Sequence, residues 1–140
     1  MTASRLAYLD ASAFVKLAAP EPESPALETE LRDWPHAVAS ELLAVEAKRF
    51  GQRYGGSAPR LVEAALRRIT LIPLAGEIRE VAASVVPPEL RSLAAIHLAT
   101  ALTLGAELVT FFVYDHRLAG RRGQRVEHLA SRPVGDVPCK

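Results

Sequence analysis

Short apolar runs alternate with segments of helical spacing along this sequence, and that alternation leaves few possible folds. The apolar runs cover residues 6–9, 36–39, 71–74 and 108–114, and a last strand could begin at Arg125. Strands that alternate with helices favour a parallel sheet with helices on both faces. Pro73 places the third run at an edge of that sheet. We therefore predict an α/β protein, a three-layer α/β/α domain with a central parallel sheet of four to five short strands.

The size of the chain is sufficient for one hydrophobic core. Its 140 residues are 49% hydrophobic but only 6% aromatic, so Ala, Leu and Val must supply most of that core. We predict a single domain over residues 1–131 and a loosely ordered tail over residues 132–140, where proline and glycine recur. The net charge of +1 by itself predicts neither a nucleic-acid coat nor an acidic tail.

Cysteine usage and hydropathy indicate a cytoplasmic setting. Cys139 is the only cysteine, so a disulfide within the chain is excluded. Its position next to the C-terminus argues against a role as a catalytic thiol. No apolar run approaches the roughly 20 residues that a membrane span needs, and the N-terminus lacks the pattern of a signal peptide. We expect a reducing compartment and no membrane partner.

Acidic residues follow two of the predicted strands. Asp10 ends the first apolar run and Asp115 ends the last long one, and ligand sites in parallel sheets form beyond the carboxyl ends of the strands. Glu46, in the helix that follows the second strand, can point to the same end. The structural alternatives are a helix cap for either aspartate and a solvated charge for Glu46. Two acids at two strand ends favour a site over two separate caps.

Three carboxylates brought together repel one another, and a divalent cation is the usual way to keep them ionised. Ligation by oxygen alone favours Mg²⁺ or Mn²⁺ over zinc. Other carboxylate chemistries fit less well: a haloacid-dehalogenase-type phosphatase needs a second aspartate where this chain has Ser12, and a response-regulator receiver needs a phospho-acceptor aspartate and a late lysine that are missing. The sequence also contains no glycine-rich phosphate loop and no nucleophile elbow.

Four blocks in order along the chain carry a family resemblance: YLDASAFVKL, ASELLAVEAKR, ELRSLAAIHLATALTLGAEL and VYDHRLA. Together they resemble a PIN-domain ribonuclease, specifically a VapC-type toxin of a bacterial toxin–antitoxin pair. The resemblance implies that Asp10, Glu46 and Asp115 are the catalytic acids that hold metal, with Ser12 as a supporting hydroxyl. It further implies a Mg²⁺-dependent or Mn²⁺-dependent endoribonuclease, an RNA substrate, a cognate VapB-type antitoxin and a homodimer.

Ala94 is the main departure from the family pattern. The family usually has aspartate at this position, so a further acid of the pocket is missing, and alanine has no oxygen with which to replace it. We expect weak metal binding and an impaired or absent nuclease. Natural loss and deliberate replacement both account for the alanine, and the intact neighbouring residues favour replacement. The rival hypothesis is a catalytically inactive PIN-like module that binds antitoxin or RNA without cleavage.

Histidine and arginine residues near the acids have two interpretations each. His97, one turn after Ala94, could be a general base, but a buried histidine held by a backbone carbonyl or a neighbouring side chain is the favoured interpretation. Arg117, Arg121 and Arg122 could steer an RNA backbone toward the acids, or they could form a solvated helix face. The helix predicted over residues 24–31 and the helix predicted after Ser40 could serve as partner surfaces or could belong to the core.

Overall fold

A parallel four-stranded sheet forms the centre of the molecule. The computed structural model describes residues 5–105 and 108–113, and within them the strands are β1 (Leu6–Leu9), β2 (His36–Ser40), β3 (Thr70–Ile72) and β4 (Leu108–Phe112). Their order is β3-β2-β1-β4, and all three pairings are parallel. The predicted parallel sheet is confirmed, with β3 at an edge as Pro73 indicated. The strand predicted near Arg125 and the predicted tail lie outside the described residues.

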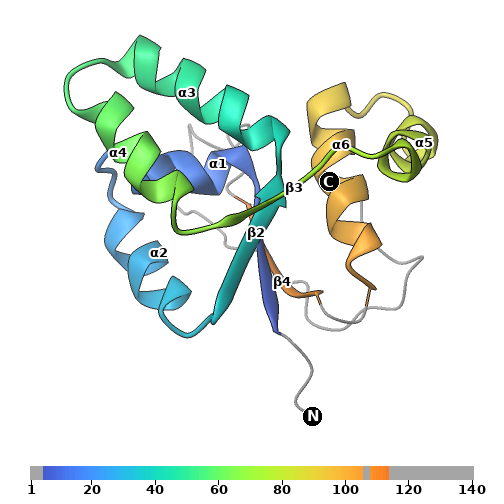
Figure 1. The fold of residues 1–140 in the computed structure, drawn as a ribbon, viewed down its shortest axis with the longest axis horizontal. Helices are drawn as coiled ribbons and strands as arrows, with labels where there is room; N and C mark the ends of the chain where they lie inside the picture. Colours follow the sequence, from blue (N-terminus) through green and yellow to red (C-terminus); the bar gives the residue numbers. More distant parts are fainter. Residues whose placement is uncertain (1–4, 106–107, 114–140) are drawn as a thin grey trace.

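Helices cover both faces of the sheet (Figure 1). One side carries α1 (Ala11–Phe14), the 3-10 helix η1 (Val15–Leu17), α2 (Ser24–Leu31), α3 (Leu42–Tyr54) and α4 (Ala58–Leu66); the other carries α5 (Gly76–Ser84) and α6 (Ser92–Thr103). The three-layer α/β/α prediction is therefore confirmed. Among the helices of the described segments, none is both long and apolar enough to cross a membrane.

Alternation along β1 divides the core between the two faces. Ala7 and Leu9 pack with residues of α1 and α2, whereas Tyr8 packs with Ala101 of α6. Side chains of a strand alternate between faces, so Asp10, two residues after Tyr8, is directed to the α6 side. The sheet thus presents Tyr8 and Asp10 to the same helix.

The carboxyl end of the sheet is fixed by backbone hydrogen bonds beyond the strands themselves. The Asp10 N–H donates to the carbonyl of Phe112 over 3.0 Å, which extends the β1–β4 pairing by one residue. The α3 helix follows β2 directly, and the N–H of Leu42 donates to the Ser40 hydroxyl over 3.3 Å. These connections bring the starts of α1 and α3 to the same edge of the sheet.

Candidate functional site

Two carboxylates from different elements meet at this edge. His97 of α6 lies between them: its Nε2 is 2.6 Å from Oε1 of Glu46 and 3.8 Å from Oδ1 of Asp10. Asp10 follows β1, and Glu46 lies in the second turn of α3. About a fifth of each carboxylate side chain is exposed, 21% for Asp10 and 22% for Glu46. The structure therefore brings together two of the three predicted acids, open to solvent.

The Asp10 carboxylate does not cap the helix that follows it. Asp10 occupies the position before α1, but its side chain makes no capping hydrogen bond to that helix. Instead, the buried Ser12 hydroxyl donates to Oδ2 of Asp10 over 2.8 Å. The hydroxyl predicted to support the first acid is thus in contact with it, and the capping alternative for Asp10 is wrong.

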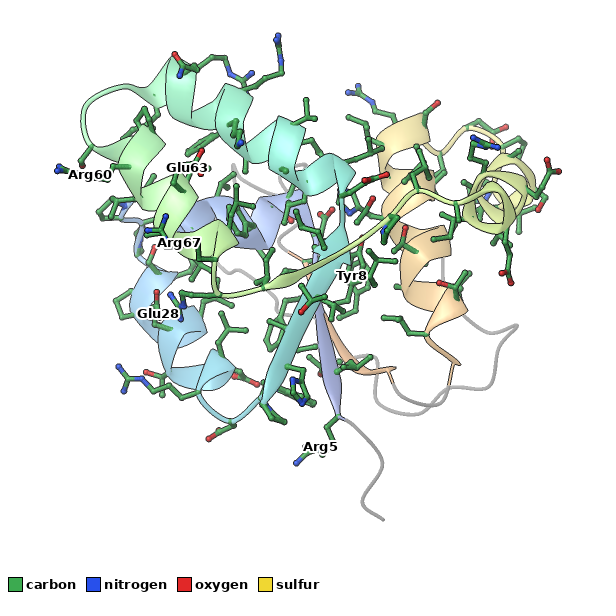
Figure 2. The ribbon with its side chains drawn as sticks, viewed as in Figure 1. Arg5, Tyr8, Glu28, Arg60, Glu63 and Arg67 are labelled. Carbon is green, nitrogen blue, oxygen red and sulfur yellow. The ribbon has the colours of Figure 1, made fainter. Side chains whose placement is uncertain are left out.

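Tyr8 also belongs to this site, although no motif in the sequence indicated it. Its hydroxyl lies 2.6 Å from Nδ1 of His97 and accepts a hydrogen bond of 3.0 Å from the backbone N–H of Ser40. Figure 2 shows Tyr8 between the sheet and α6. His97 is only 2% exposed, so the prediction of a buried histidine held by neighbouring side chains is confirmed. The sequence spacing could have indicated Tyr8 as a site residue, because it lies two residues before Asp10 in a strand and therefore on the same face.

Burial dominates the electrostatics of Tyr8. Removal from water raises the pKa of the Tyr8 hydroxyl well above its ordinary value, and the charges of Asp10 and Glu46 raise it further. Hydrogen bonds with the Ser40 backbone and the Thr100 side chain oppose this rise only in part. The phenol therefore keeps its proton at any physiological pH.

Ala94 lies one turn before His97 on α6 and is exposed. Residues three apart on a helix share a face, so position 94 belongs to the side of α6 that carries His97. The methyl group has no donor or acceptor atom for a ligand. An aspartate here would add a third carboxylate to the described part of the site.

The side chains at this edge carry the type of oxygen ligand that a hard divalent cation binds. Within the described residues, Oδ1 of Asp10 and Oε2 of Glu46 take no hydrogen bond, so each acid has an oxygen of the sort that Mg²⁺ and Mn²⁺ prefer. The described segments contain no group of three Asp, Glu, His or Cys side chains arranged to hold a metal ion. The third predicted ligand, Asp115, lies outside them, as do Arg117, Arg121 and Arg122.

Comparison with known proteins identifies the family. The sequence profile of the PIN domain matches residues 7–119. The chain belongs to the PIN-domain family. It is 42% identical over 111 residues to Ribonuclease VapC46 of Mycobacterium tuberculosis, a match that covers 79% of this chain and 85% of the relative. Ribonuclease VapC47 of the same species is 40% identical over 122 residues, with the same coverage. These relatives confirm the predicted resemblance to VapC-type PIN proteins.

Solved structures agree on the fold. A toxin–antitoxin complex from Klebsiella pneumoniae aligns with a TM-score of 0.63 at 21% identity, over 83% of this chain and 92% of that one. VapC20 of Mycobacterium tuberculosis, a toxin that cleaves the sarcin–ricin loop, aligns with a TM-score of 0.64 at 13% identity, over 87% and 98% of the two chains. At these identities the likeness shows that the PIN fold is shared.

Proposed function

We propose that this PIN-domain chain is the toxin component of a VapBC-type toxin–antitoxin system and carries the site of a divalent-metal-dependent endoribonuclease, impaired by Ala94. One observation carries the proposal: Asp10 and Glu46 meet around His97 at the carboxyl end of β1, and each partly exposed carboxylate keeps one oxygen without a hydrogen bond among the described residues. The ribonuclease names of the relatives at about 40% identity support it.

Each residue of the site has a separate proposed role. Asp10, Glu46 and Asp115 would hold Mg²⁺ or Mn²⁺, which when bound activates a water and polarises the scissile phosphate of RNA. Ser12 occupies one oxygen of Asp10 and so orients the other. At position 94, water can replace a ligand atom but not its negative charge, so the chain binds the cation weakly and cleaves slowly or not at all.

The same proposal includes the partners. The relatives and the toxin–antitoxin complex with the same fold support a cognate VapB-type antitoxin for this chain. The proposal also includes a toxin homodimer, which rests on the family resemblance alone. RNA is the substrate, and Arg117, Arg121 and Arg122 are proposed to bind its backbone through phosphate contacts. The cytoplasm, where RNA and antitoxin are made, is the proposed location.

Restoration of the missing acid tests the proposal directly. The chain and its Ala94→Asp form are compared for cleavage of total cellular RNA with Mg²⁺, with Mn²⁺ and with EDTA. We expect cleavage only by the Ala94→Asp form, and only with metal. Addition of Asp10→Asn should abolish that cleavage. Glu63→Gln makes a comparable change at a residue 53% exposed on α4 and should leave cleavage intact.

The non-catalytic module is the second candidate, and Ala94 is the observation that favours it. If the folded Ala94→Asp form fails to cleave RNA with either metal, the nuclease proposal is refuted. Tight antitoxin binding by both forms would then assign the chain to the binding class.

A further inference from the structure

We propose that Tyr8 and His97 form a positioning relay for Glu46: the Tyr8 hydroxyl donates to Nδ1 of His97, and the Nε2–H of His97 donates to Oε1 of Glu46. The relay deepens the proposed function, because its purpose rests on Glu46 acting as a cation ligand. Neither Tyr8 nor His97 is proposed to touch RNA. Both act through the carboxylate that they hold.

The direction of the two hydrogen bonds follows from the groups involved. An ionised carboxylate only accepts hydrogen bonds, so at 2.6 Å from Oε1 of Glu46 the Nε2 of His97 must be the donor. In a neutral imidazole the other nitrogen is then an acceptor. The Tyr8 oxygen accepts from the Ser40 N–H and also contacts the Thr100 side chain, whose own hydroxyl donates to the carbonyl of Ile96. The relay assigns the single Tyr8 proton to Nδ1 of His97, which lies 2.6 Å away. In this arrangement both short contacts of His97 and the bond from the Ser40 N–H are satisfied together.

The Tyr8 end of the relay is rigid. Tyr8 is 0% exposed, and its ring stacks on Phe111 with centroids 5.0 Å apart. It also meets the imidazole of His97 edge to face at 5.8 Å. The backbone N–H of Ser40 anchors the hydroxyl from the neighbouring strand β2. A hydroxyl fixed in this way holds the imidazole in one orientation and one tautomer.

The relay determines what Glu46 offers to a cation. With Oε1 held by His97, the rotation of the carboxylate is restricted and Oε2 is left for a ligand. The same Nε2 lies 3.8 Å from Oδ1 of Asp10, so the N–H dipole sits between two negative groups that would otherwise repel. Hydrogen-bond partners of metal-ligating carboxylates commonly change metal affinity by about 10–100-fold when removed. We expect a change of that size here.

The tautomer is measured first, on the unsubstituted chain. Long-range ¹⁵N–¹H spectra of the imidazoles at pH 8.5 separate the two neutral tautomers and the charged ring. His97→Gln identifies the His97 signals among the four histidines. We expect a neutral Nε2–H ring with an accepting Nδ1, and a weaker preference for it in Tyr8→Phe. A proton on Nδ1, in either the neutral or the charged ring, would overturn the relay.

Cation affinity is measured second, without reference to cleavage. Free Mn²⁺ is followed by electron paramagnetic resonance during titration of the chain and of its Ala94→Asp form. In both, His97→Leu should raise the Mn²⁺ Kd by about 10–100-fold. His97→Gln should retain most of the affinity, because its amide N–H can reach Glu46 as Nε2 does. Val62→Ala loses buried volume in the separate α3–α4 core and should leave the Kd unchanged.

The outcomes distinguish the relay from the function on which it rests. If Mn²⁺ binds and Asp10→Asn removes the binding, but His97→Leu has the Kd of the parent chain, the relay is overturned and the metal site stands. If no form binds Mn²⁺, including Ala94→Asp, the proposed metal-dependent function fails, and the tautomer measurement alone decides whether Tyr8 and His97 orient Glu46.

Discussion

The Tyr8→Phe substitution tests how much the buried hydroxyl contributes to stability. It keeps the aromatic ring, which stacks on Phe111, and removes only the oxygen. That oxygen contacts the backbone N–H of Ser40 at 3.0 Å, Nδ1 of His97 at 2.6 Å and the Thr100 side chain. Its removal leaves the Ser40 N–H and Nδ1 of His97 without this partner, whereas Thr100 keeps its bond to the Ile96 carbonyl. Ser40 and His97 are almost completely buried, with exposures of 0% and 2%. Water therefore has little access to replace the lost bonds.

The structure sets the size of the expected loss. A buried polar group left without a partner costs about 1–3 kcal/mol, so two groups cost about 2–6 kcal/mol. The lower half of that range applies because the variant no longer has to bury a hydroxyl. We expect the free energy of unfolding of Tyr8→Phe to fall by about 2–4 kcal/mol, with the slope against urea concentration unchanged.

Equilibrium urea unfolding is the assay, with Tyr54→Phe as its matched control. Tyr54 makes the same kind of ring contact, stacked on Phe50, but it is 59% exposed. Its hydroxyl has access to water, so the control should change stability by less than about 0.5 kcal/mol. A loss below about 1 kcal/mol for Tyr8→Phe would refute the reasoning, because it would mean that the buried partners find other hydrogen bonds.

Three further substitutions test the packing and the surface charges. Gly51→Ala should destabilise the chain by about 1 kcal/mol, because the added Cβ would lie 3.2 Å from the backbone Cα of Pro59. This crowding should outweigh the better helix propensity of alanine. A higher melting temperature of the variant in thermal unfolding would contradict the prediction. Leu43→Ala empties a fully buried position in the core beneath α3 and should cost about 2–5 kcal/mol in urea unfolding, whereas a cost under 1 kcal/mol would show that the site collapses. The bidentate contact of Arg68 lowers the pKa of Glu28, so this pair stabilises the fold above the unfolded-state pKa of glutamate and loses its effect as pH falls through the lowered folded-state value. Glu28→Gln should therefore cost at most about 0.5–1 kcal/mol at pH 7 and nothing at pH 2, since both side chains are more than a third exposed; an equal cost at the two pH values would exclude the ion pair as the cause.

The sequence by itself was sufficient for the architecture. The first apolar run predicted β1 at residues 6–9 with the bounds that the structure shows, and the segment that starts at Ser24 predicted α2 to within one residue at its end. Pro73 indicated the edge position of β3 correctly. These features depend on local periodicity and on backbone geometry, and a short window of sequence contains all the information needed.

Part of the site was also visible in the sequence, because parallel strands that end in acids must present them at one edge. Asp10 and Ser12 are two residues apart, so their contact is local. The place of Glu46 in the helix after the second strand indicated the same edge, and the family pattern added the departure at Ala94. The positions of Asp115 and the arginines after it lie outside the described residues and stay predictions.

Only the tertiary structure decided what Asp10 and His97 do. The local sequence around a lone aspartate before a helix is the same whether the carboxylate caps the helix or faces a site. Its role depends on which hydrogen-bond partner the folded chain brings closer to it. The hydrogen bond between Tyr8 and His97 joins residues 89 apart in the sequence, and that between His97 and Glu46 joins residues 51 apart. No local pattern encodes such pairs, because they form only when the sheet sets β1 against α6 and α3.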